Sequence, residues 1–372
     1  MLLHEQFDLV WGDAYDGLFT AKSLVEDPRF MSLRRGALTL VAAVLVLSAG
    51  LSAQNNKKQL EARSKELQAI FAVVDDVASG RQGPDDLGLT WVRADFLKAQ
   101  EGKGYVPFTV SLDPAQVKSG RVDLYWRVVA RDGSAAPSTP NDKKKKNEKI
   151  RYPYEDLTTA TVSSAGTSQI SRSFTVAAGT YDVYVLAKET PSTQKNAPAP
   201  KVSVLKHEVT VPDFWNSELS TSSLIVVDRI DPIPAPLSRE QKADRPYALG
   251  TFEIVPADTT TFPKTAELST FMQIYNAGTD AASRPDVLVE CSFYKRSAGV
   301  PDAFFNKTLP QNLNAQTIPP EFSFAAGHQL QTGQAILLSA FPEGDYRLEI
   351  KVTDKIANRT LTRDLHFSVR PS

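Results

Sequence analysis

The chain has 372 residues, with 42 Lys and Arg against 43 Asp and Glu, so its formal net charge is −1. This length accommodates two or three domains. A charge balance so close to zero argues against nucleic acid as a partner, because phosphate binding needs an excess of basic residues on one face. The 24 prolines, against 3 methionines and 4 tryptophans, favour short strands joined by turns over long helices.

A secretory signal peptide is predicted over residues 31–53. Arg34 and Arg35 form a basic region, residues 37–51 are uncharged and rich in Ala, Leu and Val, and Ser52 and Ala53 supply the small residues before a cleavage site. The apolar core is shorter than the ~20 residues that a membrane-spanning helix needs, which favours cleavage after Ala53. The alternative is an uncleaved inner-membrane anchor. No cysteine follows the apolar core, so the bacterial lipoprotein route is closed.

The start of the mature protein follows from this segment. Met31 is the natural start of a signal peptide, so residues 1–30 are interpreted as upstream sequence from a wrongly assigned start. The alternative is a cytoplasmic tail ahead of an anchor. We therefore expect an exported protein, located in the periplasm, on the cell surface or outside the cell. It would contact the membrane only through the signal segment, if that is not cleaved.

One amphipathic helix is predicted in the segment 54–83, which we assign to a helix and linker. Over residues 57–79 the apolar positions Leu60, Leu67, Ile70, Val74 and Val77 recur near heptad spacing, with charged residues between them. Gly80 is a suitable residue to end this helix. The apolar stripe is expected to cover the adjoining domain, with contact to a partner chain as the alternative.

From Leu87 onward the hydrophobic period changes to two, which predicts strands. The first region has five of them, at residues 105–112, 122–129, 170–176, 181–187 and 202–211. The second region has five more, at residues 268–275, 287–293, 336–341, 346–352 and 361–369. We assign residues 84–213 and 214–372 to two domains.

The two regions resemble each other at an offset of about 165 residues. Gly179-Thr180-Tyr181 corresponds to Gly344-Asp345-Tyr346, and residues 207–211 correspond to 365–369. Upstream, the residues from Val122 to Val128 correspond to those from Val287 to Phe293. A period of this length matches a whole domain rather than a short structural repeat, and indicates domain duplication.

The repeated Gly-x-Tyr step predicts an immunoglobulin-like fold. In such sandwiches a tyrosine near the start of the penultimate strand turns its hydroxyl back onto nearby backbone. A glycine two residues earlier permits the tight turn. Gly179, Tyr181, Gly344 and Tyr346 are therefore predicted structural corner residues, and Trp126 a buried core aromatic. The fold class is thus all-β, with two tandem immunoglobulin-like (fibronectin-like) sandwiches preceded by a signal peptide and one amphipathic helix.

Three further segments are irregular in composition. Residues 133–149, with lysines at 143–146, and residues 190–200 are interpreted as solvated insertions; an acidic surface is the alternative partner for the lysines. Residues 224–227 are continuously apolar and predict a buried first strand of the second domain. Pro232, Pro234 and Pro236 then predict an extended connector.

No catalytic or metal-binding signature appears in the sequence. His207, His328 and His366 lack the spacing of zinc ligands, and no nucleophile elbow, phosphate loop or dinucleotide fingerprint occurs. Cys291 alternates with Val287, Val289 and Phe293, so it is expected to be a small buried residue rather than a reactive thiol. We therefore expect no enzyme activity, no cofactor and no metal.

Several stretches carry a resemblance to known sequences: residues 105–108, 211–215 and 341–350. They are similar to those of uncharacterised secreted bacterial proteins whose carboxy-terminal sandwich resembles the segments found beside GWxTD-type domains. The resemblance covers most of residues 60–372, although the GWxTD motif itself is absent. It implies export and a β-sandwich, and it supplies no site residues.

Two classes of function remain open. The first is a non-enzymatic interaction or structural module of the cell envelope or surface, which binds another envelope or extracellular protein, a surface polymer or itself through sandwich edges and loops. The alternative is a carbohydrate-binding or accessory module of a secreted polymer-degrading system. In the second class, exposed aromatic residues such as Trp215, Tyr152 and Tyr154 would stack on sugar rings, and the candidate binding surface comprises Tyr152, Tyr154, Phe214 and Trp215. The simplest expectation for Phe214 and Trp215 is that they pack at the junction between the two domains.

Overall fold

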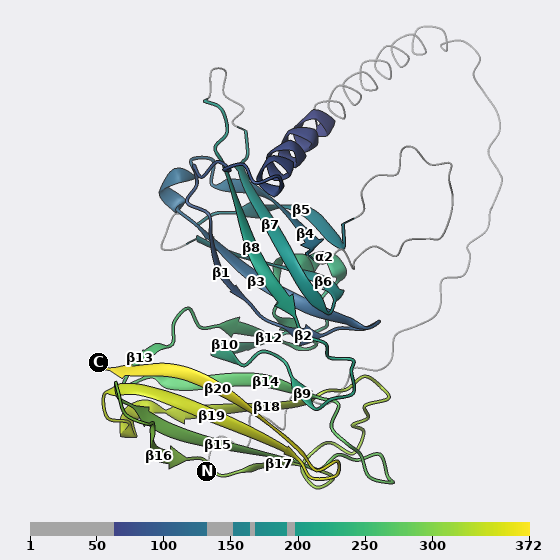
Figure 1. Ribbon diagram of the computed structural model, residues 1–372, viewed down its shortest axis with the longest axis vertical. Helices are drawn as coiled ribbons and strands as arrows, with labels where there is room; N and C mark the ends of the chain where they lie inside the picture. The colour runs from purple at the N-terminus through teal and green to yellow at the C-terminus, as the bar shows by residue number, and fades with distance from the viewer. Residues whose placement is uncertain (1–62, 132–151, 164–167, 192–197) are drawn as a thin grey trace, which may run out of the picture. The chain divides into compact units, whose positions relative to one another are not determined.

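A computed structural model describes residues 63–131, 152–163, 168–191 and 198–372 (Figure 1). The predicted upstream segment, the signal peptide, residues 57–62 of the predicted helix, insertion 133–149 and most of insertion 190–200 lie outside these residues. The chain separates into two compact units, residues 1–73 and residues 74–372, and every strand that the structure describes lies in the second unit. None of the described helices is both long and apolar enough to span a membrane.

The described part of the predicted helix covers residues 63–78. It ends where the sequence indicates: Gly80 adopts a left-handed φ of 93°, which glycine tolerates without steric cost. The amide of Gly80 donates to the Val77 carbonyl and that of Arg81 to the Asp76 carbonyl, which is the double hydrogen-bond pattern of a Schellman cap.

The first group of strands forms a β-sandwich of two antiparallel sheets. One sheet has β3 at its centre, with β6 along one side and β1 and β2 along the other. The second sheet has the order β5-β4-β7-β8. The bounds are β1 Thr90–Ala94, β2 Leu97–Lys98, β3 Lys103–Leu112, β4 Arg121–Ala130, β5 Tyr154–Thr161, β6 Ser168–Ala177, β7 Gly179–Glu189 and β8 Val202–Val211.

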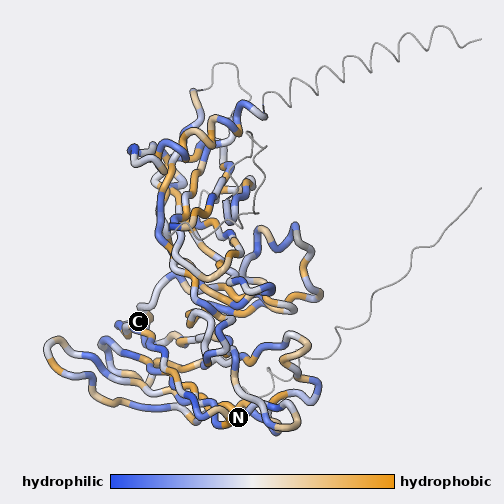
Figure 2. Tube along the Cα trace, turned by 45° about the vertical axis from the view of Figure 1, so that its right-hand side comes forward, coloured by the Kyte–Doolittle hydropathy of each residue, from blue (hydrophilic) through white to orange (hydrophobic). Residues whose placement is uncertain are grey.

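Alternation along these strands places one face of each sheet in a shared core. Trp126 is 2% exposed, as its position in the alternating pattern predicts, and Phe108 packs edge-on against it with 5.9 Å between the ring centres. Val122, Leu124 and Val128 from the same face of β4 are fully buried. Figure 2 shows how hydrophobic and hydrophilic residues alternate along the strands.

The second group of strands repeats this design with additions. One sheet has the order β11-β12-β10-β14-β18, with β9 also paired to β14; the other has the order β13-β20-β19-β15-β16, with β17 also paired to β15. The bounds are β9 Ser220–Thr221, β10 Ile225–Pro232, β11 Ala248–Leu249, β12 Phe252–Pro256, β13 Thr261–Pro263, β14 Glu267–Tyr275, β15 Val287–Arg296, β16 Ala303–Lys307, β17 Gln311–Leu313, β18 Leu330–Leu337, β19 Gly344–Asp354 and β20 Arg359–Arg370.

The strand pairing shows that the two groups are built to the same register. Val122 of β4 pairs with Glu189 of β7, and Val287 of β15 pairs with Asp354 of β19, so both partners are shifted by the same offset. Trp126 likewise pairs with Val185, and its counterpart Cys291 pairs with Ile350. This correspondence extends across whole strands, well beyond the residues that are alike in the sequence.

Two of the predicted segments differ from the structure. The prolines at 232–236 do not form an extended connector between domains, because Pro232 ends β10 and the chain then folds into an insertion. This insertion contains β11, β12 and the short helix α2 (Arg239–Asp244), which is capped by Ser238 and was not predicted. The strand predicted at 336–341 lies instead at β18, since residues 338–340 form a 3₁₀ turn that leads into the corner before β19.

The insertion buries one face of the sheet on which it packs. Ile225, Val227 and Phe271 point away from the main core and pack with Tyr247 and Ile254 of the insertion in a separate apolar cluster. The segment 224–227, predicted as a buried first strand, is thereby buried on both faces, which explains why its sequence is apolar without alternation.

The outer faces of the two corresponding sheets differ. On β4 and β7 the outward residues Tyr125 and Leu186 are 2% and 0% exposed, and the sequence after the helix passes over this face, with Gly83 packed on Val204. The corresponding residues of β15 and β19 are Glu290 and Lys351, which form an exposed ion pair of 3.7 Å. A face of this kind needs no apolar cover.

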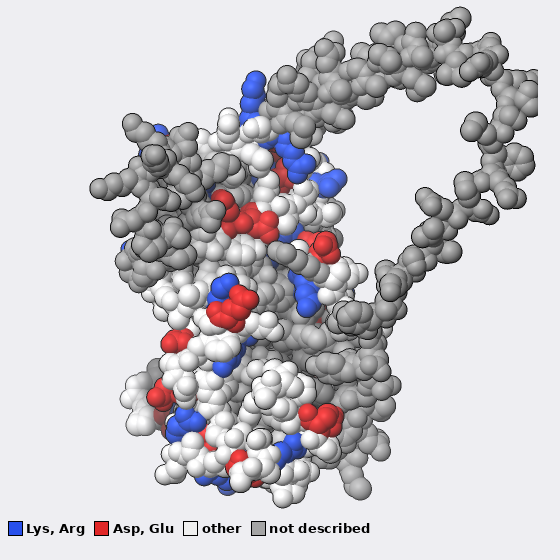
Figure 3. Space-filling view, turned by 90° about the vertical axis from the view of Figure 1, so that its right-hand side faces the viewer, with Lys and Arg blue, Asp and Glu red and all other residues white. Residues whose placement is uncertain are grey.

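The surface of the described residues carries charges of both signs. Lys and Arg are interspersed with Asp and Glu over the face in Figure 3, and neither sign predominates there. The mixture on this face agrees with the formal net charge of −1.

Candidate functional site

A hollow of roughly 370 Å³ lies on the outer face of the sheet β5-β4-β7-β8. Its volume is near the lower end of the range for small-ligand pockets. It lies over the central strands β4 and β7, and the end of the 63–78 helix forms one wall. The lining residues are Asp75, Ala78, Arg127, Val129, Ala130, Arg131, Tyr152, Asp182 and Tyr184.

Arg127 is the buried charge at the base of the hollow, and its side chain is only 4% exposed. Its Nη1 donates to Asp75 Oδ1 at 2.5 Å and its Nε donates to the Tyr125 hydroxyl at 2.8 Å. The Tyr152 ring stacks on its guanidinium at 4.1 Å. Burial by itself would lower the pKa of Arg127, but the bonds to Asp75 and Tyr125 outweigh burial and raise it. Arg127 is therefore a fixed positive charge.

Tyr125 extends this arrangement toward the edge strand. Its hydroxyl donates to Glu155 Oε2 at 2.8 Å while it accepts from Arg127. Burial and the neighbouring carboxylate raise the pKa of Tyr125 far above its usual value. The phenol therefore stays protonated and holds Arg127 in place, rather than acting as a base.

Asp182 and Arg131 form the opposite wall. Asp182 Oδ1 lies 3.4 Å from Arg131 Nε, and Lys206 Nζ contacts Asp182 Oδ2 at 2.9 Å. Arg131 also pairs with Glu208. The Asp182 side chain is 15% exposed, and its Oδ1 atom accepts no hydrogen bond from the residues that the structure describes. Because Asp182 Oδ1 is a buried atom, the group that this wall presents to solvent is the partly exposed Arg131 guanidinium.

Of the predicted surface aromatics, one belongs to the hollow. Tyr152 lines it and remains partly exposed. Tyr154, two residues further on, points to the other face of the sheet and packs on Trp126 and Phe174, each with 6.3 Å between ring centres. Residues two apart in one strand would share a face, but β5 begins only at Tyr154 and Tyr152 precedes it, so the two side chains are free to diverge. Tyr154 is a residue of the core margin, and the prediction of a surface role for it is corrected.

Phe214 and Trp215 lie between the sandwiches and also point in different directions. Phe214 is 2% exposed and packs edge-on against Tyr275 at 5.1 Å, so the prediction that it lines a binding surface is wrong. Trp215 is 46% exposed. Its Nε1 donates to the Lys103 carbonyl at 3.1 Å and Lys98 Nζ lies 4.4 Å from its ring centre, so the exposed indole is held in one orientation.

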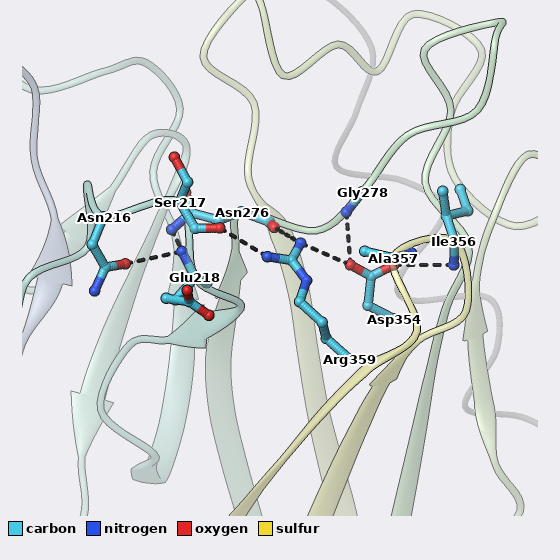
Figure 4. A network of polar contacts seen from close by, with 9 residues as sticks. All are labelled: Asn216, Ser217, Glu218, Asn276, Gly278, Asp354, Ile356, Ala357 and Arg359. Carbon is cyan, nitrogen blue, oxygen red and sulfur yellow. Dashed lines mark hydrogen bonds and ion pairs between the residues drawn. The ribbon is translucent and has the colours of Figure 1, made fainter.

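A polar network fixes the backbone that carries this tryptophan (Figure 4). Arg359 donates to the carbonyls of Ser217 and Asn276, both of which have left-handed φ values, 65° and 58°. Behind it, fully buried Asp354 accepts from Arg359 and from the amides of Gly278 and Ala357. Burial alone would raise the pKa of Asp354, yet these hydrogen bonds outweigh it and lower the pKa. Both carboxylate oxygens of Asp354 accept hydrogen bonds from the chain itself, which indicates a structural role, although the buried Arg359 Nε donates to none of the described residues.

The corner residues occupy corresponding positions in the two sandwiches. The Tyr181 hydroxyl donates to the Ala177 carbonyl at 2.9 Å, and the Tyr346 hydroxyl donates to the Pro342 carbonyl at 2.6 Å. Gly179 and Gly344 have φ values of 150° and 151°, which residues with a side chain rarely adopt. None of these four residues lines the hollow.

The other polar candidates from the sequence lie apart from one another. His207 is half-buried and stacks on Trp91 at 4.4 Å, and burial lowers its pKa. His366 is exposed on β20. Cys291 is 1% exposed, as predicted, and burial raises the pKa of its thiol to about 11. Over the described ranges, no three His, Cys, Asp or Glu residues converge as metal ligands would.

Sequence reasoning missed the charged residues of the hollow. Arg127 and Asp182 sit at outward positions of predicted strands and Arg131 follows the end of one, and at such positions charged residues are ordinarily solvated. The alternation did contain one signal. On its outward face, which a solvated strand would keep polar, β4 carries the aromatic side chain of Tyr125 next to Arg127. The partner Asp75 could not be assigned, since it comes from the helix, 52 positions away along the chain.

Comparisons with known proteins do not place the chain in a family. No family model matches the chain, and no curated protein matches it. Among solved structures, dimeric latent PorU from Porphyromonas gingivalis matches 76% of this chain and 20% of its own, at 10% identity and a TM-score of 0.29. Trypsin-activated alpha-2-macroglobulin from Escherichia coli matches 78% of this chain and 17% of its own, at 11% identity and a TM-score of 0.21. The chain thus spans a fifth or less of either protein.

Proposed function

We propose that this chain is an exported, non-enzymatic binding protein built from two tandem immunoglobulin-like sandwiches of the fibronectin kind. The hollow on the first sandwich, with the buried Arg127 at its base and the partly exposed Arg131 in its wall, is the observation that carries the proposal. It supplies polar groups suited to recognition, while its phenol and its arginine are held in their ordinary protonation states.

The immunoglobulin-like assignment is supported by topology and by the corners. In the first sandwich β1, β3 and β6 share one sheet, and β4, β5, β7 and β8 form the other. In the second, β10, β14 and β18 share one sheet, and β15, β16, β19 and β20 lie in the other. Each sandwich also has a tyrosine at the start of its penultimate strand, and the hydroxyl of this tyrosine donates to an upstream backbone carbonyl. The common register of the paired strands supports duplication of one ancestral domain.

Export is supported by the sequence alone, through the basic, apolar and small-residue succession over 31–53. Amino-terminal sequencing of protein from the producing cell tests it. We expect the mature chain to begin at Gln54 or within a few residues of it. Retention of Met1 or Met31 would contradict the proposal.

Binding through the hollow can be tested by capture from envelope fractions of the producing cell. Arg131→Glu reverses a charge at the hollow, where the side chain is 46% exposed. Arg296→Glu is its matched control, because Arg296 occupies the corresponding place in the second sandwich with a side chain 45% exposed. We expect Arg131→Glu to abolish capture and Arg296→Glu to leave it intact. Equal capture by both variants would remove the hollow from the function.

A further inference from the structure

The loop 314–329, which joins β17 to β18, contains no helix or strand along its length. Irregular loops longer than roughly 12–15 residues are uncommon within compact domains and usually have a function of their own. Arg284 fixes the first part of this loop, because its guanidinium donates to four backbone carbonyls over residues 318–322, at 2.9–3.4 Å. The second part, the turn 323–328, is held in another way.

His328 closes the turn 323–328 through both its backbone and its side chain. The amide of His328 donates to the Ser323 carbonyl at 3.2 Å, and the amide of Ser323 donates to Nδ1 of the His328 imidazole at 3.1 Å. The half-buried imidazole also packs on the Phe322 ring, with 5.8 Å between ring centres. Because Nδ1 accepts a hydrogen bond only while it carries no proton, the closed turn requires the neutral imidazole.

Protonation of the imidazole reverses the role of this nitrogen. Both ring nitrogens of an imidazolium ion are donors, so an N–H group at Nδ1 would face the N–H group of Ser323. The amide would lose its acceptor, and two partly positive hydrogens would oppose each other. The open turn therefore binds a proton more readily than the closed turn, and by linkage a fall in pH favours opening. Histidine side chains change charge between about pH 5 and pH 8.

The charged groups around the turn leave this effect without compensation. β17 and β18, which flank the loop, contain no ionisable residue, and the other ionisable residue of the loop is Glu321, which is exposed. From the segment between β14 and β15, Arg284 adds a positive charge beside the loop. Asp280 of that segment accepts from amides of its own turn, and Asp286 pairs with Lys355 at 3.1 Å. Within the described residues, none of these carboxylates pairs with His328, so none neutralises an imidazolium there.

We infer that the turn 323–328 is an acid-sensitive latch, closed while His328 is neutral and opened when the imidazole takes up a proton. Arg284 still bonds the loop as far as the Phe322 carbonyl, so the opening is confined to the residues that follow. It releases Phe324, which is half-buried against the core of the second sandwich and packs edge-on on Phe322 with 5.1 Å between ring centres. This inference is independent of the proposed binding function, because it uses no residue of the hollow.

Hydrogen exchange of the Ser323 amide, followed by NMR on the full chain, tests the latch. The rate is expressed as protection relative to an unstructured peptide at the same pH, which removes the intrinsic pH dependence of exchange. Loss of the bond to Nδ1 should lower the protection of this amide roughly 5- to 30-fold between about pH 7.5 and about pH 5. Equal protection at the two pH values would overturn the inference.

Substitutions of His328 separate the latch from a general effect of acid. His328→Asn keeps an acceptor bonded to Cγ, as Nδ1 is, but has no proton to gain, so the Ser323 amide should stay protected at both pH values. His328→Ala removes the acceptor, and protection should be low at both. His366→Asn replaces an exposed histidine of β20 and should behave like the wild type. A loss of protection in acid as large in His328→Asn as in the wild type would also overturn the inference, since another group would then be responsible.

Discussion

Replacing Tyr346 measures how much one corner contributes to stability. Its side chain is fully buried, and its hydroxyl donates to the Pro342 carbonyl at 2.6 Å. In Tyr346→Phe that carbonyl loses its partner, so the free energy of unfolding should fall by roughly 1–3 kcal/mol. The phenylalanine ring fills the space of the tyrosine ring, so no cavity forms.

Tyr346→Ala should cost more, because it also removes the ring. The ring packs against Phe305, Phe341 and Phe367 with 5.5, 5.3 and 5.4 Å between ring centres. Loss of a buried aromatic side chain costs about 3–5 kcal/mol, and three aromatic neighbours place this site in the upper part of that range.

Urea denaturation followed by circular dichroism measures both variants. Of the described tryptophans, Trp91 and Trp126 lie in the first sandwich and Trp215 lies at the junction, so tryptophan fluorescence follows the first sandwich and the junction in the same samples. Tyr181→Phe is the matched variant, since its hydroxyl donates to the Ala177 carbonyl at 2.9 Å. It should lose a similar free energy, and its loss should appear in the fluorescence transition.

Partner capture by folded Tyr346→Phe should equal that of the wild type, because the tyrosine lies at a corner away from the hollow. An unchanged urea midpoint together with lost capture would refute the reasoning. Tyr346 would then belong to a binding site, and the structural interpretation of the Gly-x-Tyr step would have to be given up.

Four further perturbations follow from the same structure. Gly344→Ala forces a side chain onto a backbone with φ of 151° and should cost about 1–3 kcal/mol, measured by urea denaturation, whereas an unstrained variant would keep its midpoint. The lowered pKa of Asp354 means that its contribution is complete above the unfolded-state pKa of roughly 3.9 and is lost as the pH falls through the folded-state value. The stability difference between wild type and Asp354→Asn should therefore shrink in acid, and a constant difference would refute the assignment. Burial raises the pKa of Asp95, which accepts from Tyr247 across the sandwich junction, so the wild type should lose stability relative to Asp95→Asn as the pH rises above roughly 4; the opposite slope would contradict this. Leu186→Lys buries a charge on a fully covered face and should lower the free energy of unfolding by more than ~3 kcal/mol. Lys351→Leu, at the corresponding exposed place, should leave it nearly unchanged, and equal losses in the two variants would refute the difference between the two faces.

The junction between the sandwiches illustrates what composition cannot indicate. Tyr247 of the insertion donates to Asp95 at 2.7 Å, and the Tyr105 hydroxyl donates to the Pro246 carbonyl at 2.8 Å. Residues more than a hundred positions apart meet there because the insertion folds back over its own sheet. The prolines of the insertion indicate an extended backbone, which suits the end of a strand as well as a connector. The sequence pattern alone predicted a connector, whereas Pro232 ends β10.

The sequence by itself determined most of the long strands and their repetition, although it missed β1 and β5. Alternation along a strand is a local property, so the buried face of β4, the buried Cys291 and the exposed His366 could each be assigned from neighbouring residues. The paired Gly-x-Tyr steps were visible for the same reason, since the glycine and the tyrosine stand two residues apart and their function is a local turn.

Only the tertiary structure decided where the charged residues converge. The hollow joins Asp75 from the end of a helix, Arg127 and Arg131 from β4 and its end, Tyr152 from the approach to β5, and Asp182 from β7. Each of these residues alone has the pattern of a solvated surface position. Their proximity depends on strand order and on the helix end that covers the face, and both are set by burial of apolar surface between distant segments, which no local period records.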